Sequence, residues 1–150
     1  MLKITYGDLF EYAAENSIIA HGCNAQGVMG SGFAKQLRQR FPIAYLNYRI
    51  AFIEGGLELG GYVLVSTKKR HVFNCITQRD YGRDKETVYV DYSAVHKSLS
   101  HVAQHSKKYN YPVHIPLIGG GLANGHKDTL IGIFEEVFED VNCVLYLSEN

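Results

Sequence analysis

Two glycine-rich loops are the parts of this sequence best suited to chemistry. The first spans residues 27–34 (GVMGSGFA) and the second spans residues 118–125 (IGGGLANG). A backbone without Cβ atoms can approach a ligand closely. A helix that begins beside such a loop adds free N–H donors and the positive end of its dipole, which favours phosphate. Two such loops in one small domain predict a ligand with two phosphates, such as a pyrophosphate.

Polar residues near these loops are candidates for sugar recognition or acid–base work. The amides of Asn24 and Gln26 could read sugar hydroxyls, or they could cap a turn and satisfy local backbone groups. His21 stands late in an apolar run, so it is either an acid–base group near neutral pH or a core histidine. Asp128 stands where a helix begins, so helix capping competes with a catalytic role.

Several familiar motifs are missing from these loops. The first loop lacks the Gly-Lys-Ser/Thr of a Walker A motif and the spacing of a dinucleotide fingerprint. Ser31 lacks the strand–Gly-x-Ser-x-Gly–helix elbow of a nucleophile, so we expect it to be a small residue that lets phosphate approach. No histidine–carboxylate spacing predicts a metal site.

Charge and cysteine usage limit the partners and the compartment. Fifteen Lys and Arg balance fifteen Asp and Glu, so no strong field attracts nucleic acid or a membrane. The three cysteines occur singly, which predicts buried free thiols in a reducing compartment. No apolar run is long enough to span a bilayer, and the N-terminal residues lack the features of a signal peptide. We therefore expect a cytoplasmic protein.

The hydrophobic pattern alternates between strand-like and helix-like segments. Strands are expected near residue 4 and at residues 17–23, 61–67, 72–77, 113–118 and 143–147. Helices are expected at residues 31–41, from Pro42 onward with Ile43, Leu46, Ile50 and Ile53, at residues 91–109, and around residues 130–138. Residues 68–70 join two of the strands as a hairpin. The order predicts an α/β fold, a three-layer α/β/α domain with a mixed, mostly parallel sheet. Both glycine loops then follow the carboxyl ends of strands, where ligands bind.

These motifs together resemble the macro domain family, the ADP-ribose-binding fold, over essentially all of residues 1–150 as a single domain. Gly7-Asp8-Leu9 matches an early family motif, residues 24–34 match the first loop, and residues 118–123 match the second. The pattern His-x-Cys-Asn at 21–24, a loop ending Gly-x-Gly-Phe-Ala, and a helix ending Arg-Phe-Pro is similar to the branch that contains ADP-ribose-1″-phosphate phosphatase.

The resemblance implies roles for individual residues. Asp8 would accept a hydrogen bond from the adenine amino group, although an Asp after Gly often caps a turn. Asn24 would hold the distal ribose, and Leu147 would pack near the adenine. The ligand-binding set implied in this way is Asp8, Leu9, Asn24, Gln26, Met29, Gly30, Ser31, Gly32, Phe33, Thr77, Ile118, Gly119, Gly120, Gly121, Leu122, Ala123 and Leu147.

The implied activity is metal-independent hydrolysis of ADP-ribose-1″-phosphate to ADP-ribose and phosphate, with His21, Asn24 and Asp128 as catalytic residues and no cofactor. A related branch removes ADP-ribose from proteins with a Lys and an Asp, where this chain has Gln78 and Ala123. That departure counts against the same mechanism here. ADP-ribosyl hydrolysis of a modified protein or nucleic acid, and non-catalytic reading of ADP-ribose, are the alternatives. The expected partner is ADP-ribose or its 1″-phosphate, with no membrane and no strong nucleic-acid signal.

Overall fold

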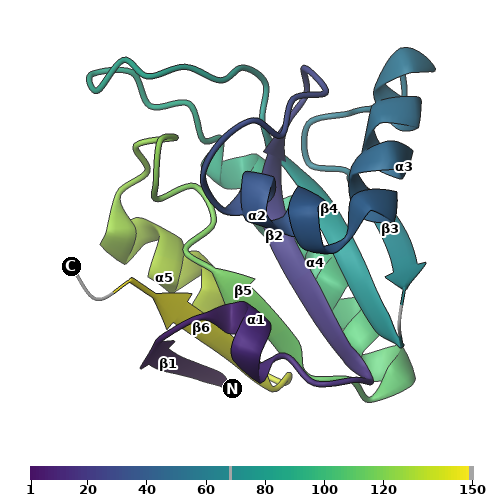
Figure 1. Cartoon of the computed structure of the whole chain (residues 1–150). Helices are drawn as coiled ribbons and strands as arrows, with labels where there is room; N and C mark the ends of the chain where they lie inside the picture. Colours follow the sequence, from purple (N-terminus) through teal and green to yellow (C-terminus); the bar gives the residue numbers. More distant parts are fainter. Residues whose placement is uncertain (68, 149–150) are drawn as a thin grey trace.

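A six-stranded sheet forms the centre of the computed structural model, which describes residues 1–67 and 69–148 (Figure 1). Its spatial order is β1-β6-β5-β2-β4-β3. All neighbouring strands are parallel except β3 and β4, which form an antiparallel pair. The expectation of a mixed, mostly parallel sheet is confirmed. Residue 68, in the expected hairpin turn, lies outside the described residues. The strands are β1 (Leu2–Tyr6), β2 (Ser17–Asn24), β3 (Tyr62–Thr67), β4 (Arg70–Gln78), β5 (Val113–Pro116) and β6 (Cys143–Leu147).

Helices cover both faces of the sheet and give the expected three layers (Figure 1). Helices α4 and α5 pack on one face, and α1, α2 and the start of α3 pack on the other. Asp91 begins α4 by accepting a hydrogen bond from the Ala94 amide at 2.9 Å, and Pro42 stands in the first turn of α3. The helices are α1 (Leu9–Tyr12), α2 (Gly32–Arg40), α3 (Pro42–Ile53), α4 (Tyr92–Tyr109) and α5 (Lys127–Val137).

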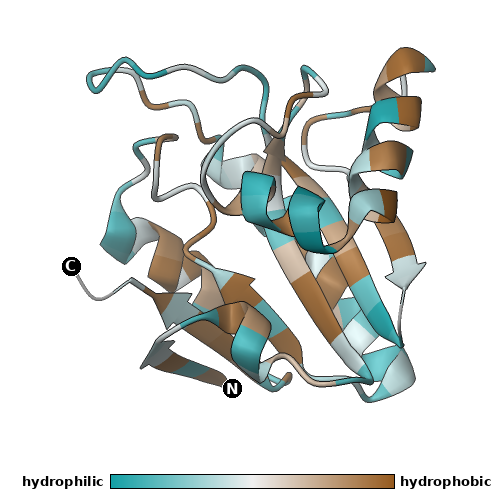
Figure 2. Ribbon diagram, viewed as in Figure 1, coloured by the Kyte–Doolittle hydropathy of each residue, from teal (hydrophilic) through white to brown (hydrophobic). Residues whose placement is uncertain are grey.

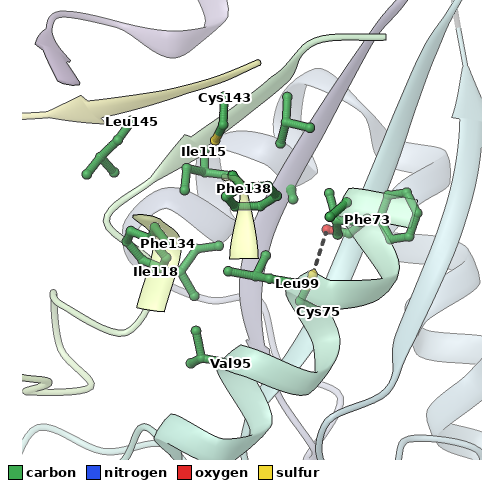
Figure 3. Packing of buried hydrophobic residues seen from close by; sticks show 14 of the residues in the cluster. Phe73, Cys75, Val95, Leu99, Ile115, Ile118, Phe134, Phe138, Cys143 and Leu145 are labelled. Carbon is green, nitrogen blue, oxygen red and sulfur yellow. Dashed lines mark hydrogen bonds between the residues drawn. The ribbon is translucent and has the colours of Figure 1, made fainter. Parts of the chain in front are cut away.

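The hydrophobic core lies on both faces of β2, the strand that leads to the first glycine loop. Ile18 packs toward α4 and α5, whereas Ile19 packs toward α1 and α2, as alternation along a strand requires. Hydrophobic residues dominate the central strands in Figure 2. Figure 3 shows Leu99 of α4 and Phe134 of α5 packed with Ile115 and Ile118 at the end of β5. Both strands that carry glycine loops are therefore anchored in the core.

Helix α3 forms where the sequence predicts it, and the aliphatic residues that mark it in the sequence face away from the core. Its large aliphatic residues are exposed, and the buried residues are Ala44 and Tyr48. The Tyr48 hydroxyl donates to the Asn24 side-chain oxygen at 3.0 Å, so this tyrosine satisfies a buried acceptor that an aliphatic residue cannot. The exposed residues are Ile43, Leu46, Ile50 and Ile53, which are 40%, 51%, 41% and 71% exposed.

The three cysteines are buried and free, as expected. Burial raises the pKa of the Cys23 thiol well above its ordinary value, so this sulfur stays protonated and is unsuited to nucleophilic attack. Among the described residues, no helix combines the length and the apolar character that crossing a membrane requires.

Candidate ligand-binding and active site

One large cavity lies at the carboxyl ends of β1, β2, β4, β5 and β6, and both glycine loops line it. Its volume is about 1500 Å³, above the roughly 300–1,000 Å³ of ordinary small-molecule pockets. The fold thus brings together residues far apart in the sequence. The predicted site residues that line the cavity are Asp8, Leu9, His21, Asn24, Met29, Gly30, Ser31, Gly32, Phe33, Ile118, Gly119, Gly120, Gly121, Leu122, Ala123 and Leu147.

Three predicted site residues do not line the cavity. The Gln26 amide nitrogen instead donates to the Arg79 carbonyl and to the Asp80 carboxylate, both at 3.1 Å. Thr77 is fully buried. Asp128 is exposed in the first turn of α5, where an acidic residue favours the helix dipole. The structure therefore does not bring Asp128 to the cavity wall with His21.

The Asn24 side chain organises the turn into the first glycine loop. Its Oδ1 accepts from the backbone amides of Gln26 at 3.0 Å and Val28 at 3.3 Å, and its Nδ2 donates to the Val28 carbonyl at 2.9 Å. The turn-capping interpretation of Asn24 is thus realised. One N–H of Nδ2 has no partner among the described residues, and Asn24 lines the cavity, so a donor remains for a ligand.

His21 is only 1% exposed, yet it forms part of the cavity wall. Its Nε2 lies 2.7 Å from Asn74 Oδ1, and Asn74 Nδ2 donates to the Ala44 carbonyl at 3.1 Å. That second bond fixes the amide orientation, so Nε2 carries the hydrogen and Nδ1 is the acceptor, with Cys23 Sγ 3.9 Å from it. Desolvation by burial lowers the pKa of His21 to about 4, although the Asn74 hydrogen bond opposes this shift. The imidazole is therefore neutral near pH 7.

Helix α2 offers unsatisfied backbone donors at the cavity. Ser31 occupies its N-cap position in an extended conformation without a side-chain capping hydrogen bond. The first-turn N–H groups of α2 therefore remain available to an anion. By contrast, Asp8 does cap α1, since its Oδ1 accepts from the Phe10 amide at 3.0 Å. Asp8 lines the cavity as well, so its second oxygen can meet a ligand.

The second glycine loop requires glycine for two separate reasons. Gly119 has a φ of +82°, and a Cβ placed there would lie 2.5 Å from Val90 Cγ2. A Cβ on Gly125 would lie 2.6 Å from the Gly119 carbonyl oxygen. Both positions exclude a side chain because the loop folds tightly against itself and against Val90. Its backbone is therefore held close to the cavity.

Known proteins of similar sequence cover the chain from end to end, although no protein-family model matches it. A 17.5 kDa protein of Enterobacteria phage T4 is 30% identical over 97% of this chain and 95% of its own length. The ADP-ribose 1″-phosphate phosphatase of Candida albicans is 25% identical over 100% of this chain and 95% of its own. The DNA ADP-ribosyl glycohydrolase of Mycobacterium tuberculosis is 27% identical over 95% of this chain, which spans 42% of that protein.

Solved structures share the arrangement of helices and strands. A protein of unknown function from Bacteroides thetaiotaomicron superposes with a TM-score of 0.88 at 27% identity, covering 98% of both chains. The macrodomain of Mycobacterium tuberculosis DarG superposes with a TM-score of 0.82 at 23% identity, covering 97% of each chain. The chain belongs to the macro domain family.

The macro domain cavity also has wall residues that sequence reasoning missed. Tyr81, Gly82 and Arg83 lie in the long connection between β4 and α4, and Lys127 begins α5. No periodic pattern marks residues 79–90, so the sequence predicts only a loop there. The one available signal is an aromatic and two basic side chains directly after the Ile-Thr-Gln strand end.

Proposed function

We propose that this macro domain binds ADP-ribose and hydrolyses ADP-ribose-1″-phosphate to ADP-ribose and phosphate without a metal ion. The observation that carries the proposal is that two glycine loops, each leading to a helix, line one cavity of about 1500 Å³. Backbone N–H groups at such loops suit a pyrophosphate. The full-length similarity to the Candida albicans phosphatase supports the same substrate.

The ligand would lie across the carboxyl ends of the strands in one direction. Asp8 and Leu147, beyond β1 and β6, would receive the adenine. The loops beyond β2 and β5 would hold the pyrophosphate. Asn24, at the end of β2, would donate its free N–H to the distal ribose. This orientation places the 1″-phosphate at the end of the cavity near His21 and Asn24.

Hydrolysis in this arrangement needs a water that attacks phosphorus while the bond from phosphorus to the ribose oxygen breaks. The neutral His21, with Nε2 held by Asn74, offers Nδ1 as a hydrogen-bond acceptor to that water. The oxygen of the water stays on phosphorus, and the proton that the water loses to Nδ1 passes to the departing ribose oxygen, which gives ADP-ribose and inorganic phosphate. Positioning of the substrate and backbone donors at the developing charge supply the rest of the acceleration. Asp128 takes no part in this step, because it lies away from the cavity wall.

Removal of ADP-ribose from a modified macromolecule is a second candidate. The cavity volume, which exceeds that of ordinary small-molecule pockets, leaves room for an attached polymer, and the Mycobacterium tuberculosis relative carries a name of this kind. Gln78 and Ala123 supply neither a nucleophilic amine nor a carboxylate, so this reaction would need another water-based mechanism. A protein that binds ADP-ribose without catalysing a reaction would need only the two glycine loops.

Phosphorus NMR of ADP-ribose-1″-phosphate incubated with purified protein and a chelator tests the proposal. We expect the phosphomonoester signal to decay into inorganic phosphate while the pyrophosphate signals persist as those of ADP-ribose. Binding of the nucleotide without decay of the phosphomonoester signal would contradict phosphatase activity. The remaining candidates would then be non-catalytic binding of ADP-ribose and removal of ADP-ribose from a modified macromolecule. Release of ADP-ribose from ADP-ribosylated DNA or protein in the same format would favour the second hydrolase.

A further inference from the structure

We infer that Arg83 binds the phosphate carried by the distal ribose and thereby sets the preference of this macro domain for a phosphorylated ligand. The inference rests on the proposed function. It concerns residues 79–90, here called the strap, which leave β4 beyond the strand ends and return to the start of α4 (Figure 1).

The strap has a fixed position beside the cavity, because its two ends are hydrogen-bonded to each other. Gln78, directly before the strap, and Val90, its last residue, form an antiparallel bridge. The Asp91 amide donates to the Thr77 carbonyl at 2.8 Å. The loop therefore begins and ends at one place on the sheet, directly beside the cavity wall residue Gln78.

The first end of the strap is tied to the segment that follows Asn24. The Ala25 amide donates to the carbonyls of Gln78 at 3.0 Å and Arg79 at 3.2 Å. The Gln26 amide group adds its two bonds to Arg79 and Asp80. These contacts give Gln26 a role that differs from sugar recognition: it holds the strap against the first glycine loop.

The far part of the strap is tied to the second glycine loop. Asn124 Nδ2 donates to the carbonyls of Asp84 and Thr87, both at 2.8 Å. The Tyr89 amide donates to the Ala123 carbonyl at 2.9 Å. Both glycine loops are thus joined by one segment, and residues 81–83 between the two ties line the cavity.

Arg83 is well suited to an anion at this place. Arg83 and Lys127 are the two cationic side chains among the lining residues, and the guanidinium of Arg83 has no hydrogen-bond or ion-pair partner among residues 1–67 and 69–148. A guanidinium donates two parallel hydrogen bonds to phosphate oxygens. The nearby acidic residue Asp84 is engaged within the strap, where its carboxylate accepts from the Glu86 amide and the Thr87 hydroxyl.

The position along the sheet selects which phosphate Arg83 meets. Asp8, at the proposed adenine end, follows the edge strand β1, whereas the strap leaves β4, four places along the strand order. At a spacing of about 4.8 Å between strands, Asp8 and the base of the strap at β4 are separated by roughly 19 Å along the sheet, and the strap then runs back toward Asn124 of the second glycine loop. The strap is also tied beside Asn24, the residue proposed for the distal ribose. Arg83 therefore lies away from the adenine end, between the tie beside Asn24 and the tie to Asn124, and the neighbourhood of Asn24 assigns it to the 1″-phosphate.

Calorimetric titration of Arg83→Gln with ADP-ribose and with ADP-ribose-1″-phosphate, at one salt concentration, tests this inference. Loss of a charged hydrogen bond should raise the Kd for the 1″-phosphate roughly tenfold or more, while the Kd for ADP-ribose stays within about twofold. Arg83→Lys should recover part of the loss. Arg79→Gln is the matched control, because Arg79 lies in the same strap but its side chain does not line the cavity; both Kd values should stay unchanged.

Two results would overturn the inference. Equal weakening of both ligands would assign Arg83 to the pyrophosphate or to the fold of the strap, and unchanged Kd values would place it outside the site. In either case the wild-type protein still binds both nucleotides, so the proposed function survives. If the wild-type protein binds neither nucleotide, the proposed function is wrong, and the inference fails with it.

Discussion

His21 and Asn74 are joined by a hydrogen bond of 2.7 Å between Nε2 and Oδ1 in the interior of the sheet, on the parallel strands β2 and β4. Because Asn74 is itself held by the Ala44 carbonyl, this pair fixes the imidazole ring and its tautomer. His21 is thus buried like a core residue, yet its fixed ring provides a hydrogen-bond acceptor at the cavity wall.

The buried His21 predicts a specific dependence of stability on pH. The pKa of His21 is about 4 in the folded protein, below the ordinary value near 6.5. Between these two pH values, His21 binds a proton in the unfolded chain but not in the folded protein. Stability should fall as pH drops from 6.5 toward 4, by about 2 kcal/mol between pH 6.5 and 5 from this group. Urea unfolding of wild type and His21→Gln at both pH values isolates the effect from His71, His105 and His114, whose pKa values burial also lowers. Parallel pH profiles of the two proteins would contradict it.

Gly119 and Gly121 form a matched pair within the second loop. Gly119→Ala should destabilise the protein by about 1–3 kcal/mol, because the backbone has a φ of +82° and the new Cβ would meet Val90. Gly121→Ala has no atom within 4 Å of the new Cβ, and its thermal unfolding should resemble that of wild type. Equal stability of the two variants would show that the tight loop is not required.

Asn24 and Gln26 are predicted to contribute unequally to stability. Asn24→Ala removes one donor and one acceptor with three backbone partners in a buried turn, so the free energy of unfolding should fall by about 1–3 kcal/mol. Gln26→Ala removes exposed hydrogen bonds and should cost less than about 1 kcal/mol. Chemical denaturation measures both, and a larger cost for Gln26→Ala would reverse the assignment of the turn to Asn24.

A substitution of Asp128 distinguishes a role in stabilising helix α5 from a role in catalysis. Asp128→Ala should lower stability by about 0.3–1 kcal/mol through the dipole of α5. Phosphate release should continue near the wild-type rate, because the side chain does not line the cavity. A loss of turnover with ligand binding intact would return Asp128 to the catalytic group.

Much of the fold could be predicted from the sequence because each strand that carries a loop is a mostly apolar run followed within a few residues by glycines. The same patterns could not orient α3, whose two faces are both apolar, so the buried Tyr48 and the exposed Ile50 look alike in sequence. The strap was missed because hydrogen bonds, not hydrophobic burial, hold it in place. The contact between His105 on α4 and His71 on β4, with 2.6 Å between Nε2 and Nδ1, could not be predicted either, since a polar residue on a helix reveals nothing of its partner on a strand.

Titration of ¹⁵N-labelled protein with ADP-ribose, followed by amide chemical shifts, tests the central claim most directly. If the two glycine loops hold the pyrophosphate, the largest shifts should fall on the amides of residues 30–33 and 118–123 together, with saturation at one ligand per chain. Shifts confined to one loop, shifts elsewhere on the sheet, or no shifts at millimolar ligand would contradict the account.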